Sequence, residues 1–267
     1  MAEDLAGELL AIARSAAREA AELVRDRRPA GRVEVTATKS SATDIVTEMD
    51  RAAERLLVDR ILAQRPDDGV LGEEGAESPG TSGVTWVLDP IDGTVNYLYG
   101  IPGYGVSVGV RVGDEVVAGV VINPATRETW SATKGRGAEL DGRPIRVNDE
   151  QDLAMALLAT GFGYESSRRA RQAEILRTVL PRVRDIRRAG AASLDLCAVA
   201  CGRVDAYYER GLKPWDLAAG GLIAAEAGAR VEGLQGRSAG EDLVVAAPPA
   251  LFEPLAELLL ELGADRD

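Results

Sequence analysis

The apolar positions of this chain recur at helical spacing near both ends and alternate with polar positions in its middle. Residues 2–28 are rich in alanine and leucine with charges at helical spacing, which predicts an amphipathic helix that ends near Pro29. Residues 47–64 predict a second helix. From residue 104 to residue 147, apolar and polar residues alternate in short runs that are separated by turn residues. This pattern, with Asp141-Gly142 as a hairpin signal, predicts an antiparallel meander. Two further short strands are expected at residues 33–38 and 85–88, and Val70-Leu71 forms a short apolar step before Gly72.

Beyond residue 155 the pattern changes to short apolar runs that alternate with helical segments. Pro214 would begin one of these helices, since proline is favoured at the first helical position. The change lies near residues 148–153, and we take it as the boundary between an N-terminal half, residues 1–150, and a C-terminal half, residues 151–267, of a single unit. The expected strands of the second half are residues 156–160, 185–188, 204–208 and 243–246, and its expected helices are residues 167–180, 193–201, 214–227 and 249–262.

Composition excludes several classes of function. Hydrophobic residues make up 46% of the 267 residues, so the chain is expected to be globular. Its 31 basic and 43 acidic residues give a net charge of −12, which makes it a poor candidate for binding nucleic acid through phosphates. Histidine is absent, so Ser-His-Asp and Cys-His mechanisms and His-ligated zinc are excluded. Acid–base chemistry must then come from carboxylates, hydroxyls, lysine or metal-bound water.

The cysteines and the N-terminal residues indicate in which cellular compartment the protein is expected. Cys197 and Cys201 lie four residues apart in a predicted helix, and we interpret them as small buried apolar side chains rather than a disulfide. The first residues include Glu3, Asp4 and Glu8 without an apolar stretch, so no signal peptide is expected. No segment approaches the length of a transmembrane span, and the expected location is the cytoplasm.

The segment Asp-Pro-Ile-Asp-Gly-Thr, residues 89–94, is the most informative in the chain. It follows the apolar run of residues 85–88, which predicts a buried strand whose end carries two carboxylates. Asp, Pro and Gly are ordinary turn residues, but a turn alone does not account for two acids after a buried strand. Oxygen ligands in this arrangement are typical of a Mg²⁺ site. Thr94 would open a short helix and could either cap it or polarise an attacking water, beside backbone N–H groups that offer an anion seat.

Two further acidic segments have both structural and functional interpretations. Gly72-Glu73-Glu74-Gly75 is an exposed acidic loop by itself, and only in company with the other motifs does Glu73 or Glu74 become a candidate ligand. Asp216 would lie in the first turn of the helix after Pro214, where an acid is electrostatically ordinary. Small residues follow it and would permit close packing. A metal role and an ordinary helix-start role stay open for Asp216 on local grounds.

The segment that precedes the second predicted helix reads as structural when taken alone. Thr47 and Asp50 have the spacing of a capping box at the start of that helix. Lys39, some residues upstream, is expected to be a solvated surface lysine.

Taken together, the motifs resemble the inositol monophosphatase family, and in particular its bacterial members. The resemblance rests on residues 89–94 with Asn96-Tyr97, on Gly72-Glu73-Glu74 upstream, and on Trp215 to Gly220 downstream, and it covers the chain from about Lys39 to the last strand. It implies an α+β fold with α-β-α-β-α layers, homodimers, and hydrolysis of phosphate monoesters with two or three Mg²⁺ ions. It also implies inhibition by Li⁺, which would occupy a metal position after turnover.

The resemblance assigns a role to each candidate residue. Asp89 would bridge two ions, and Thr94, oriented by Asp50, would activate water together with Glu73. The implied metal ligands are Glu73, Asp89, the carbonyl of Ile91, Asp92 and Asp216. The implied substrate contacts are the N–H groups of Gly93 and Thr94 for phosphate, and Asp92, Gly190, Ala191, Ala192, Glu209 and Asp216 for the sugar alcohol.

The leading hypothesis is hydrolysis of inositol-1-phosphate, because Glu209 suits a polyol hydroxyl. Ala191 replaces a hydroxyl residue found in some relatives, so only its backbone could bind the ring. The same chemistry on histidinol phosphate, fructose 1,6-bisphosphate or an adenosine bisphosphate is a second hypothesis. A catalytically silent binding or regulatory protein on the same fold is the third, and the intact set of acids argues against it.

Overall fold

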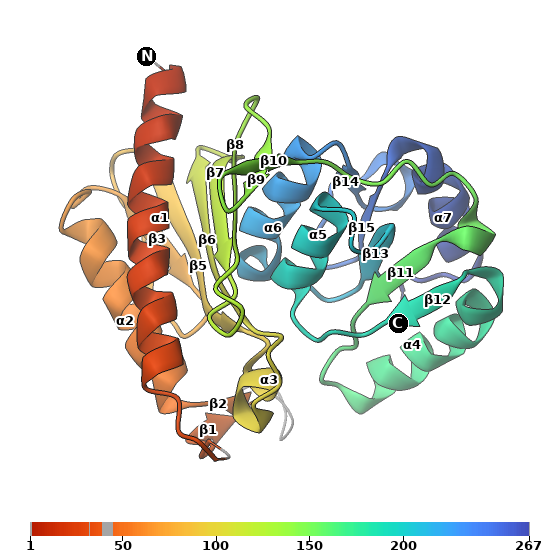
Figure 1. The fold of residues 1–267 in the computed structure, drawn as a ribbon, viewed down its shortest axis with the longest axis horizontal. Helices are drawn as coiled ribbons and strands as arrows, with labels where there is room; N and C mark the ends of the chain where they lie inside the picture. The colour runs from red at the N-terminus through yellow and green to blue at the C-terminus, as the bar shows by residue number, and fades with distance from the viewer. Residues whose placement is uncertain (1, 32, 39–44, 267) are drawn as a thin grey trace.

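The chain folds into five alternating layers of helices and sheets. The structure is a computed structural model that describes residues 2–31, 33–38 and 45–266, so Lys39 lies outside the described part. Figure 1 shows one helical layer on the outer face of each large sheet and a third between the two sheets. This is the expected α-β-α-β-α arrangement. The three layers are α1 (Ala2–Asp26) with α2 (Glu48–Leu62), α5 (Ala192–Ala200) with α6 (Pro214–Glu226), and α4 (Ser166–Val179) with α7 (Pro249–Glu261).

The first sheet has eight strands in the order β10-β9-β8-β7-β6-β5-β3-β4. Its strands from β5 to β10 pair antiparallel in sequence order, which confirms the predicted meander, and Asp141-Gly142 joins the predicted hairpin. β3 pairs parallel to β5. The strands are β3 (Gly69–Gly72), β4 (Glu77–Ser78), β5 (Val84–Asp92), β6 (Gly105–Val112), β7 (Glu115–Ile122), β8 (Thr129–Thr133), β9 (Ala138–Leu140) and β10 (Arg143–Ile145).

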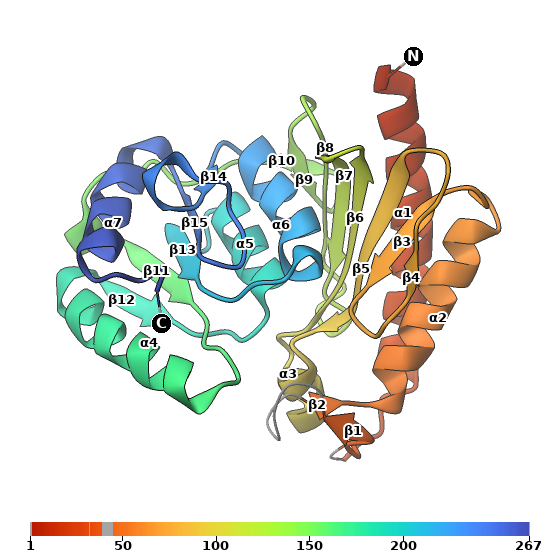
Figure 2. The ribbon, with the colours of Figure 1, turned by 180° about the vertical axis from the view of Figure 1, so that it is seen from behind.

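The second sheet has five strands in the order β12-β11-β13-β15-β14, and Figure 2 shows it from behind. β11 pairs parallel to both of its neighbours, and the remaining pairs are antiparallel. The short strand β14 was not predicted. The strand expected at residues 33–38 is reduced to β1 (Ala37–Thr38), which pairs with β2 (Ile45–Val46). The strands of the second sheet are β11 (Leu157–Thr160), β12 (Asp185–Arg187), β13 (Ala206–Glu209), β14 (Arg230–Glu232) and β15 (Val244–Ala247).

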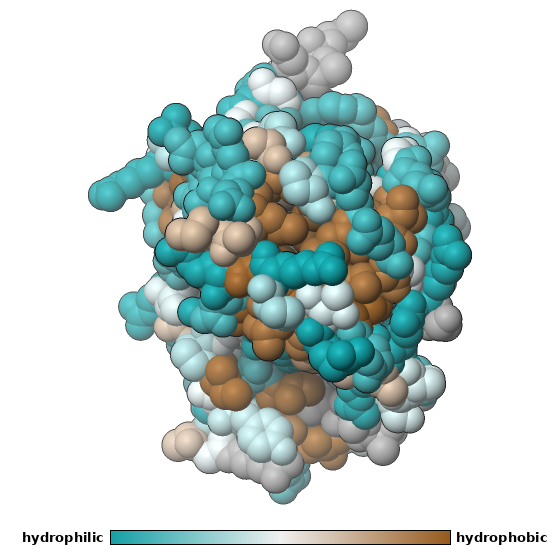
Figure 3. All heavy atoms as spheres, turned by 90° about the vertical axis from the view of Figure 1, so that its right-hand side faces the viewer, coloured by the Kyte–Doolittle hydropathy of each residue, from teal (hydrophilic) through white to brown (hydrophobic). Residues whose placement is uncertain are grey.

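Each helical layer buries an apolar face against a sheet. On α1 the buried positions recur every three or four residues, as in Leu9, Ala13 and Ala16, and the alanines let the helix lie close to the first sheet. The outer surface over the second sheet is mostly hydrophilic, with apolar side chains visible between charged ones (Figure 3). No described helix is long and apolar enough to cross a bilayer.

Two glycines in the first sheet set the position of α6. A Cβ built on Gly109 would lie 2.7 Å from the Cβ of Ala218, and one on Gly119 would lie 3.0 Å from the Cα of Ala219. The first distance is shorter than real Cβ atoms show and the second is very tight, so the two glycines allow the helix to lie this close to β6 and β7. The close packing expected from the small residues after Asp216 is therefore present. It holds α6 against the face of the first sheet, with Asp216 of its first turn near the C-terminal end of β5.

Candidate active site

The acidic segment is the end of β5 itself rather than a turn after it. We expected the strand to stop at Leu88, but β5 continues to Asp92. The pairing with β6 shifts register between Asp89 and Asp92. Residues three apart point to opposite faces of a regular strand, and an irregularity that inserts an extra residue restores them to one side. The shift therefore lets two carboxylates from one strand reach the same site.

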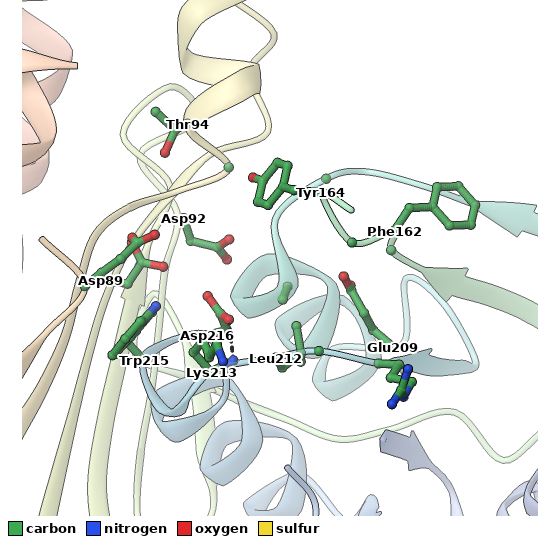
Figure 4. A pocket seen from close by; sticks show the side chains of 18 of the residues that line it. Asp89, Asp92, Thr94, Phe162, Tyr164, Glu209, Leu212, Lys213, Trp215 and Asp216 are labelled. Atoms are coloured by element: carbon green, nitrogen blue, oxygen red, sulfur yellow. Dashed lines mark hydrogen bonds between the residues drawn. The ribbon is translucent and has the colours of Figure 1, made fainter. Parts of the chain in front are cut away.

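Three carboxylates meet there. One oxygen each from Asp89, Asp92 and Asp216 lies within 4.8 Å of the others. Burial, followed by the charges of Glu73, Asp92 and Asp216, raises the pKa of Asp89 well above its ordinary value. The pKa of Asp216 is also raised well above its ordinary value, mainly by burial and then by the negative charges of Asp92 and Glu73. Figure 4 shows these acids on one side of the pocket and Glu209 on the other.

The loop after β3 resolves the choice between its two glutamates. Glu73 lines the pocket of about 440 Å³ that contains the carboxylates, whereas Glu74 is not among its lining residues. The N–H of Glu73 donates to the carbonyl of Leu88 at 3.1 Å, which ties the loop to β5. Glu73 thus brings a fourth acid to the cluster.

This cluster fits a divalent cation. Buried carboxylates that raise one another's pKa are costly as neighbouring anions and become favourable when a cation lies among them. All the donors are oxygen atoms, which are the ligands that Mg²⁺ prefers. The carbonyl of Ile91 is a further oxygen at the same pocket. The residues that the resemblance implied as ligands are therefore gathered in one place.

Asp50 and Thr94 form a buried pair beside the cluster. Thr94 Oγ1 lies 3.1 Å from Asp50 Oδ1 and 3.0 Å from the carbonyl of Ile91. A hydroxyl donates one hydrogen, so donation to Asp50 leaves the Ile91 carbonyl for another partner. Burial raises the pKa of Asp50 to about 6, and hydrogen bonds from Thr47 act against this shift. The capping box of α2 is present too, so Asp50 has a structural role as well as this contact.

The start of α3 (Thr94–Tyr99) lies against the C-terminal half. Gly93 has φ 86°, and a Cβ on it would lie 3.0 Å from the carbonyl of Gly190 and 3.1 Å from Cβ of Ala191. Asn96 fixes this approach, because its amide donates to the carbonyls of Gly103 at 2.6 Å and Ala189 at 2.7 Å. The N–H groups at Gly93 and Thr94 are thus presented next to the loop that leads into α5.

Glu209 occupies the far end of the pocket. Burial raises its pKa to about 7, while the hydroxyl of Tyr207, which donates to Glu209 Oε2 at 2.6 Å, acts in the opposite direction. Gly161 leaves room for it, since a Cβ there would overlap the carboxylate. Gly190 and Ala192 also line the pocket, whereas Ala191 is buried and does not.

Comparison with known proteins places this site in a family. Residues 6–264 match the sequence profile of the inositol monophosphatase family. The chain belongs to the inositol monophosphatase family. It is 51% identical to the inositol-1-monophosphatase SuhB of Mycobacterium tuberculosis, over 97% of this chain and 92% of that protein. Membership indicates a phosphatase, a hydrolase of phosphate esters.

Solved structures and a second group of relatives agree with this assignment. The SuhB structure from Bartonella henselae superposes with a TM-score of 0.87 at 34% identity and covers 94% of this chain and 98% of that one. A protein of Pseudomonas aeruginosa named Nus factor SuhB is 40% identical over 85% of this chain and 86% of its own length.

This family member holds Asp92 with a residue that sequence reasoning missed. Asp92 Oδ2 accepts hydrogen bonds from the Ser193 backbone N–H at 2.6 Å and from the Ser193 hydroxyl at 2.5 Å. Burial raises the pKa of Asp92, and these Ser193 hydrogen bonds act against the shift. No local pattern in the sequence marks Ser193, because its partner lies in the other half of the chain.

Glu54 was also missed, although a signal for it existed. Its carboxylate accepts from the N–H groups of Glu74 at 2.8 Å and Ala76 at 3.0 Å, and so it holds the loop that carries Glu73. Glu54 is buried and lies four residues after Asp50 on α2. That spacing places both acids on one face of a helix, which could have been read from the sequence.

Substitution Ser193→Ala in this phosphatase is expected to weaken metal binding and activity by about 10- to 100-fold, as is usual for residues that orient a ligand. The hydroxyl donor to Asp92 is lost, whereas the backbone donor remains. Titration of Mn²⁺ into the metal-free protein, followed by electron paramagnetic resonance, measures the affinity directly. Ser238→Ala is the matched control, because Ser238 is exposed and does not line the pocket. Equal Mn²⁺ affinity in wild type and Ser193→Ala would contradict this role.

The pH dependence of stability follows from the raised pKa values. Asp50 and Glu209 have folded-state pKa values of about 6 and about 7, so the folded state binds more protons than the unfolded state between pH 5 and 7. Metal-free protein should therefore lose stability as the pH rises through this window. Acids with lowered pKa values, such as Asp68, act in the opposite sense but at lower pH.

Calorimetry in chelator and in Mg²⁺ at pH 5.5 and pH 8 tests this prediction. The Tm in chelator should be lower at pH 8, and the increase caused by Mg²⁺ should be larger at pH 8, where fewer protons compete with the cation for the carboxylates. A Tm in chelator that rises between the two pH values would show that the buried acids do not control stability.

Proposed function

We propose that this chain is a Mg²⁺-dependent phosphatase that hydrolyses inositol-1-phosphate to inositol and phosphate. The observation that carries the proposal is the meeting of Asp89, Asp92 and Asp216 in one pocket with the Asp50–Thr94 pair and Glu209. The names of the mycobacterial relatives support the choice of substrate. Glu73, Asp89, the Ile91 carbonyl, Asp92 and Asp216 would hold two or three Mg²⁺ ions, which supply charge neutralisation and a lowered pKa for an attacking water.

The protein's own groups then position the reactants. Thr94 donates its hydrogen to Asp50, so its oxygen is left to accept a hydrogen bond from the attacking water and orient it. Glu73 supplies a further carboxylate near that water and helps Thr94 to activate it. The N–H groups of Gly93 and Thr94 bind phosphate oxygens. Little covalent work is required of the protein in phosphoryl transfer, which suits a chain without histidine.

The other end of the pocket binds the alcohol. Glu209, held by the Tyr207 hydroxyl, accepts a hydrogen bond from a ring hydroxyl. Gly190 and Ala192 offer backbone groups at the same end, and Asp92 and Asp216 contact the hydroxyls near the ester. Ala191 lies behind this surface and shapes it by packing against Gly93.

Phosphate release from inositol-1-phosphate, measured after chelator treatment with and without added Mg²⁺, tests the proposal. Phosphate release that requires Mg²⁺ supports the proposal, and the absence of metal-dependent release would contradict it. A panel with histidinol phosphate, fructose 1,6-bisphosphate and adenosine 3′,5′-bisphosphate, compared by kcat/KM, ranks the alternative substrates. Inhibition by Li⁺ and a homodimeric mass in light scattering are further predictions, as is a cytoplasmic location.

A regulatory role is the second candidate, because relatives such as the Pseudomonas aeruginosa protein are named Nus factor. The net charge of −12 disfavours direct binding to nucleic acid, so such a role would act through a protein partner. The complete set of acids in the pocket favours catalysis.

A further inference from the structure

The short helix α3, which carries Thr94 at its first position, depends on outside contacts for its orientation. It has only six residues, and a helix of this length is marginal in water by itself. Its N-terminal part is held by the hydrogen bond between Thr94 and Asp50 and by the amide of Asn96. A tilt of so short a helix would move the Thr94 hydroxyl. The C-terminal end of α3 must therefore be held as well.

Arg28, two residues beyond the C-terminal end of α1, holds that end of α3. Its Nε donates to the carbonyl of Tyr97 at 3.1 Å, and its guanidinium lies 5.6 Å from the centroid of the Tyr97 ring. The chain then runs from α1 past α3 toward β1 (Figure 1), and the N–H of Val33 donates to the carbonyl of Leu98 at 3.3 Å. A cation at the last carbonyls of a helix adds donors where the helix presents acceptors, and it complements the negative end of the helix dipole.

The guanidinium of Arg28 is itself fixed in place. One Nη donates to the carbonyl of Pro29 at 2.9 Å, and the other donates to the carbonyl of Gly31 at 3.4 Å. A Cβ on Gly100 would lie 2.7 Å from an Nη of Arg28, and Gly100 has φ 74°. Glycine at this position thus provides both the backbone conformation that ends α3 and the space for the guanidinium.

Tyr97 connects the Arg28 contact to the interior. Its side chain is fully buried and packs edge-on against Tyr104, with ring centroids 5.3 Å apart and planes at 83°. Burial raises the pKa of Tyr97 to about 12; the charge of Arg28 acts against this rise, and the charge of Asp50 adds to it. Because a close-packed interior transmits displacements, a shift of Tyr97 would be felt at the Asp50–Thr94 pair.

We propose that Arg28 is a positioning residue of the phosphatase: by holding the Tyr97 end of α3, it sets where the Thr94 hydroxyl lies relative to the attacking water. Arg28 does not line the pocket, so it acts through α3 and not by contact with the substrate. The proposal rests on the proposed function, which gives Thr94 its part in orienting the water. A misplacement of about 1 Å in such a group costs about 10²-fold in rate.

Arg28→Gln is expected to lower kcat on inositol-1-phosphate about 10- to 100-fold, with KM and Mn²⁺ affinity changed by less than about 3-fold. Arg27→Gln is the matched control, because Arg27 is an exposed neighbour outside the pocket, and it should keep the wild-type kcat. In a Thr94→Val background, Arg28→Gln should lower kcat by less than about 2-fold, because Arg28 acts through Thr94. General destabilisation would instead lower activity equally in both backgrounds.

Nuclear magnetic resonance of ¹³C-labelled threonine methyl groups reads the position of Thr94 without turnover. The loss of one resonance in Thr94→Val identifies the Thr94 methyl group. We expect Arg28→Gln to shift or broaden this resonance, and Arg27→Gln to leave it in place.

The outcomes for Arg28 and for the proposed function are distinguishable. An unmoved Thr94 resonance in Arg28→Gln overturns the positioning role, even if wild type hydrolyses inositol-1-phosphate. Equal losses of kcat from Arg28→Gln with and without the Thr94 hydroxyl overturn it too. A wild type that releases no phosphate overturns the proposed function, and the methyl resonance then still decides whether Arg28 positions Thr94.

Discussion

Asp89→Asn is expected to abolish phosphatase activity, with kcat lower by more than about 10³-fold, because the loss of one preorganised electrostatic contact already costs about 10²–10³. Asp89 is central to the acidic cluster, and its pKa responds to Glu73, Asp92 and Asp216. The amide keeps the shape of the side chain but removes the charge that would bind the cation. Steady-state assays on inositol-1-phosphate at saturating Mg²⁺ measure the effect.

The fold should survive this change. In metal-free protein the amide removes an ionisable group from a buried cluster of like charges, so the Tm of Asp89→Asn in chelator should equal or exceed that of wild type at pH 8. Its Tm should also respond less to Mg²⁺. Asp114→Asn, in an exposed turn between β6 and β7, is the control and should retain full activity. Substantial activity in Asp89→Asn would show that the metal assignment is wrong.

Thr94→Val is expected to lower kcat by about 10²–10⁴-fold, the usual contribution of a positioned proton-transfer group. Valine matches threonine in shape, but it removes the hydroxyl that lies 3.1 Å from Asp50 Oδ1. In the proposed mechanism the attacking water then loses its link to the Asp50 carboxylate, whereas the N–H of residue 94, proposed to bind phosphate, remains. KM should change much less than kcat.

Two companion variants distinguish catalysis from structure. Thr94→Ser restores a hydroxyl and should recover most of the activity. Asp50→Asn combined with Thr94→Val should cost little more than Thr94→Val alone, because the two residues act as one unit. Fully additive losses would mean that Asp50 acts through the cap of α2 and not through Thr94.

Periodicity predicted most of the fold because most elements bury one clear face. The alternation from residue 104 to residue 147 predicted the meander, and the alanine stripe predicted α1. The end of β5 was mispredicted because Pro90 cannot donate to a sheet and therefore resembles a strand terminus, whereas the register shift accommodates it. β14 has a single apolar residue, Val231, between two charged ones, too little for a pattern to register.

The candidate site shows a similar division. The oxygen-rich segment at residues 89–94 was recognisable from residue types alone, and the resemblance supplied the roles of Asp50 and Asp216. Nothing local distinguished Glu73 from Glu74, because their difference arises from the hydrogen bonds that Glu54 makes to the loop. Ser193 was invisible for the same reason: its importance comes from contact with Asp92, 101 positions away in the chain.

The division of the acids between β5 and α6 has a mechanical consequence. Asp89 and Asp92 belong to the first sheet, and Asp216 belongs to the central helical layer. An ion held by all three carboxylates would link the first sheet to the central helical layer. When the ion leaves, repulsion among the carboxylates would tend to separate the two layers. Amide hydrogen exchange in the first turns of α5 and α6 should then be faster in chelator, so the same cation that serves the chemistry would also set how tightly the molecule is closed.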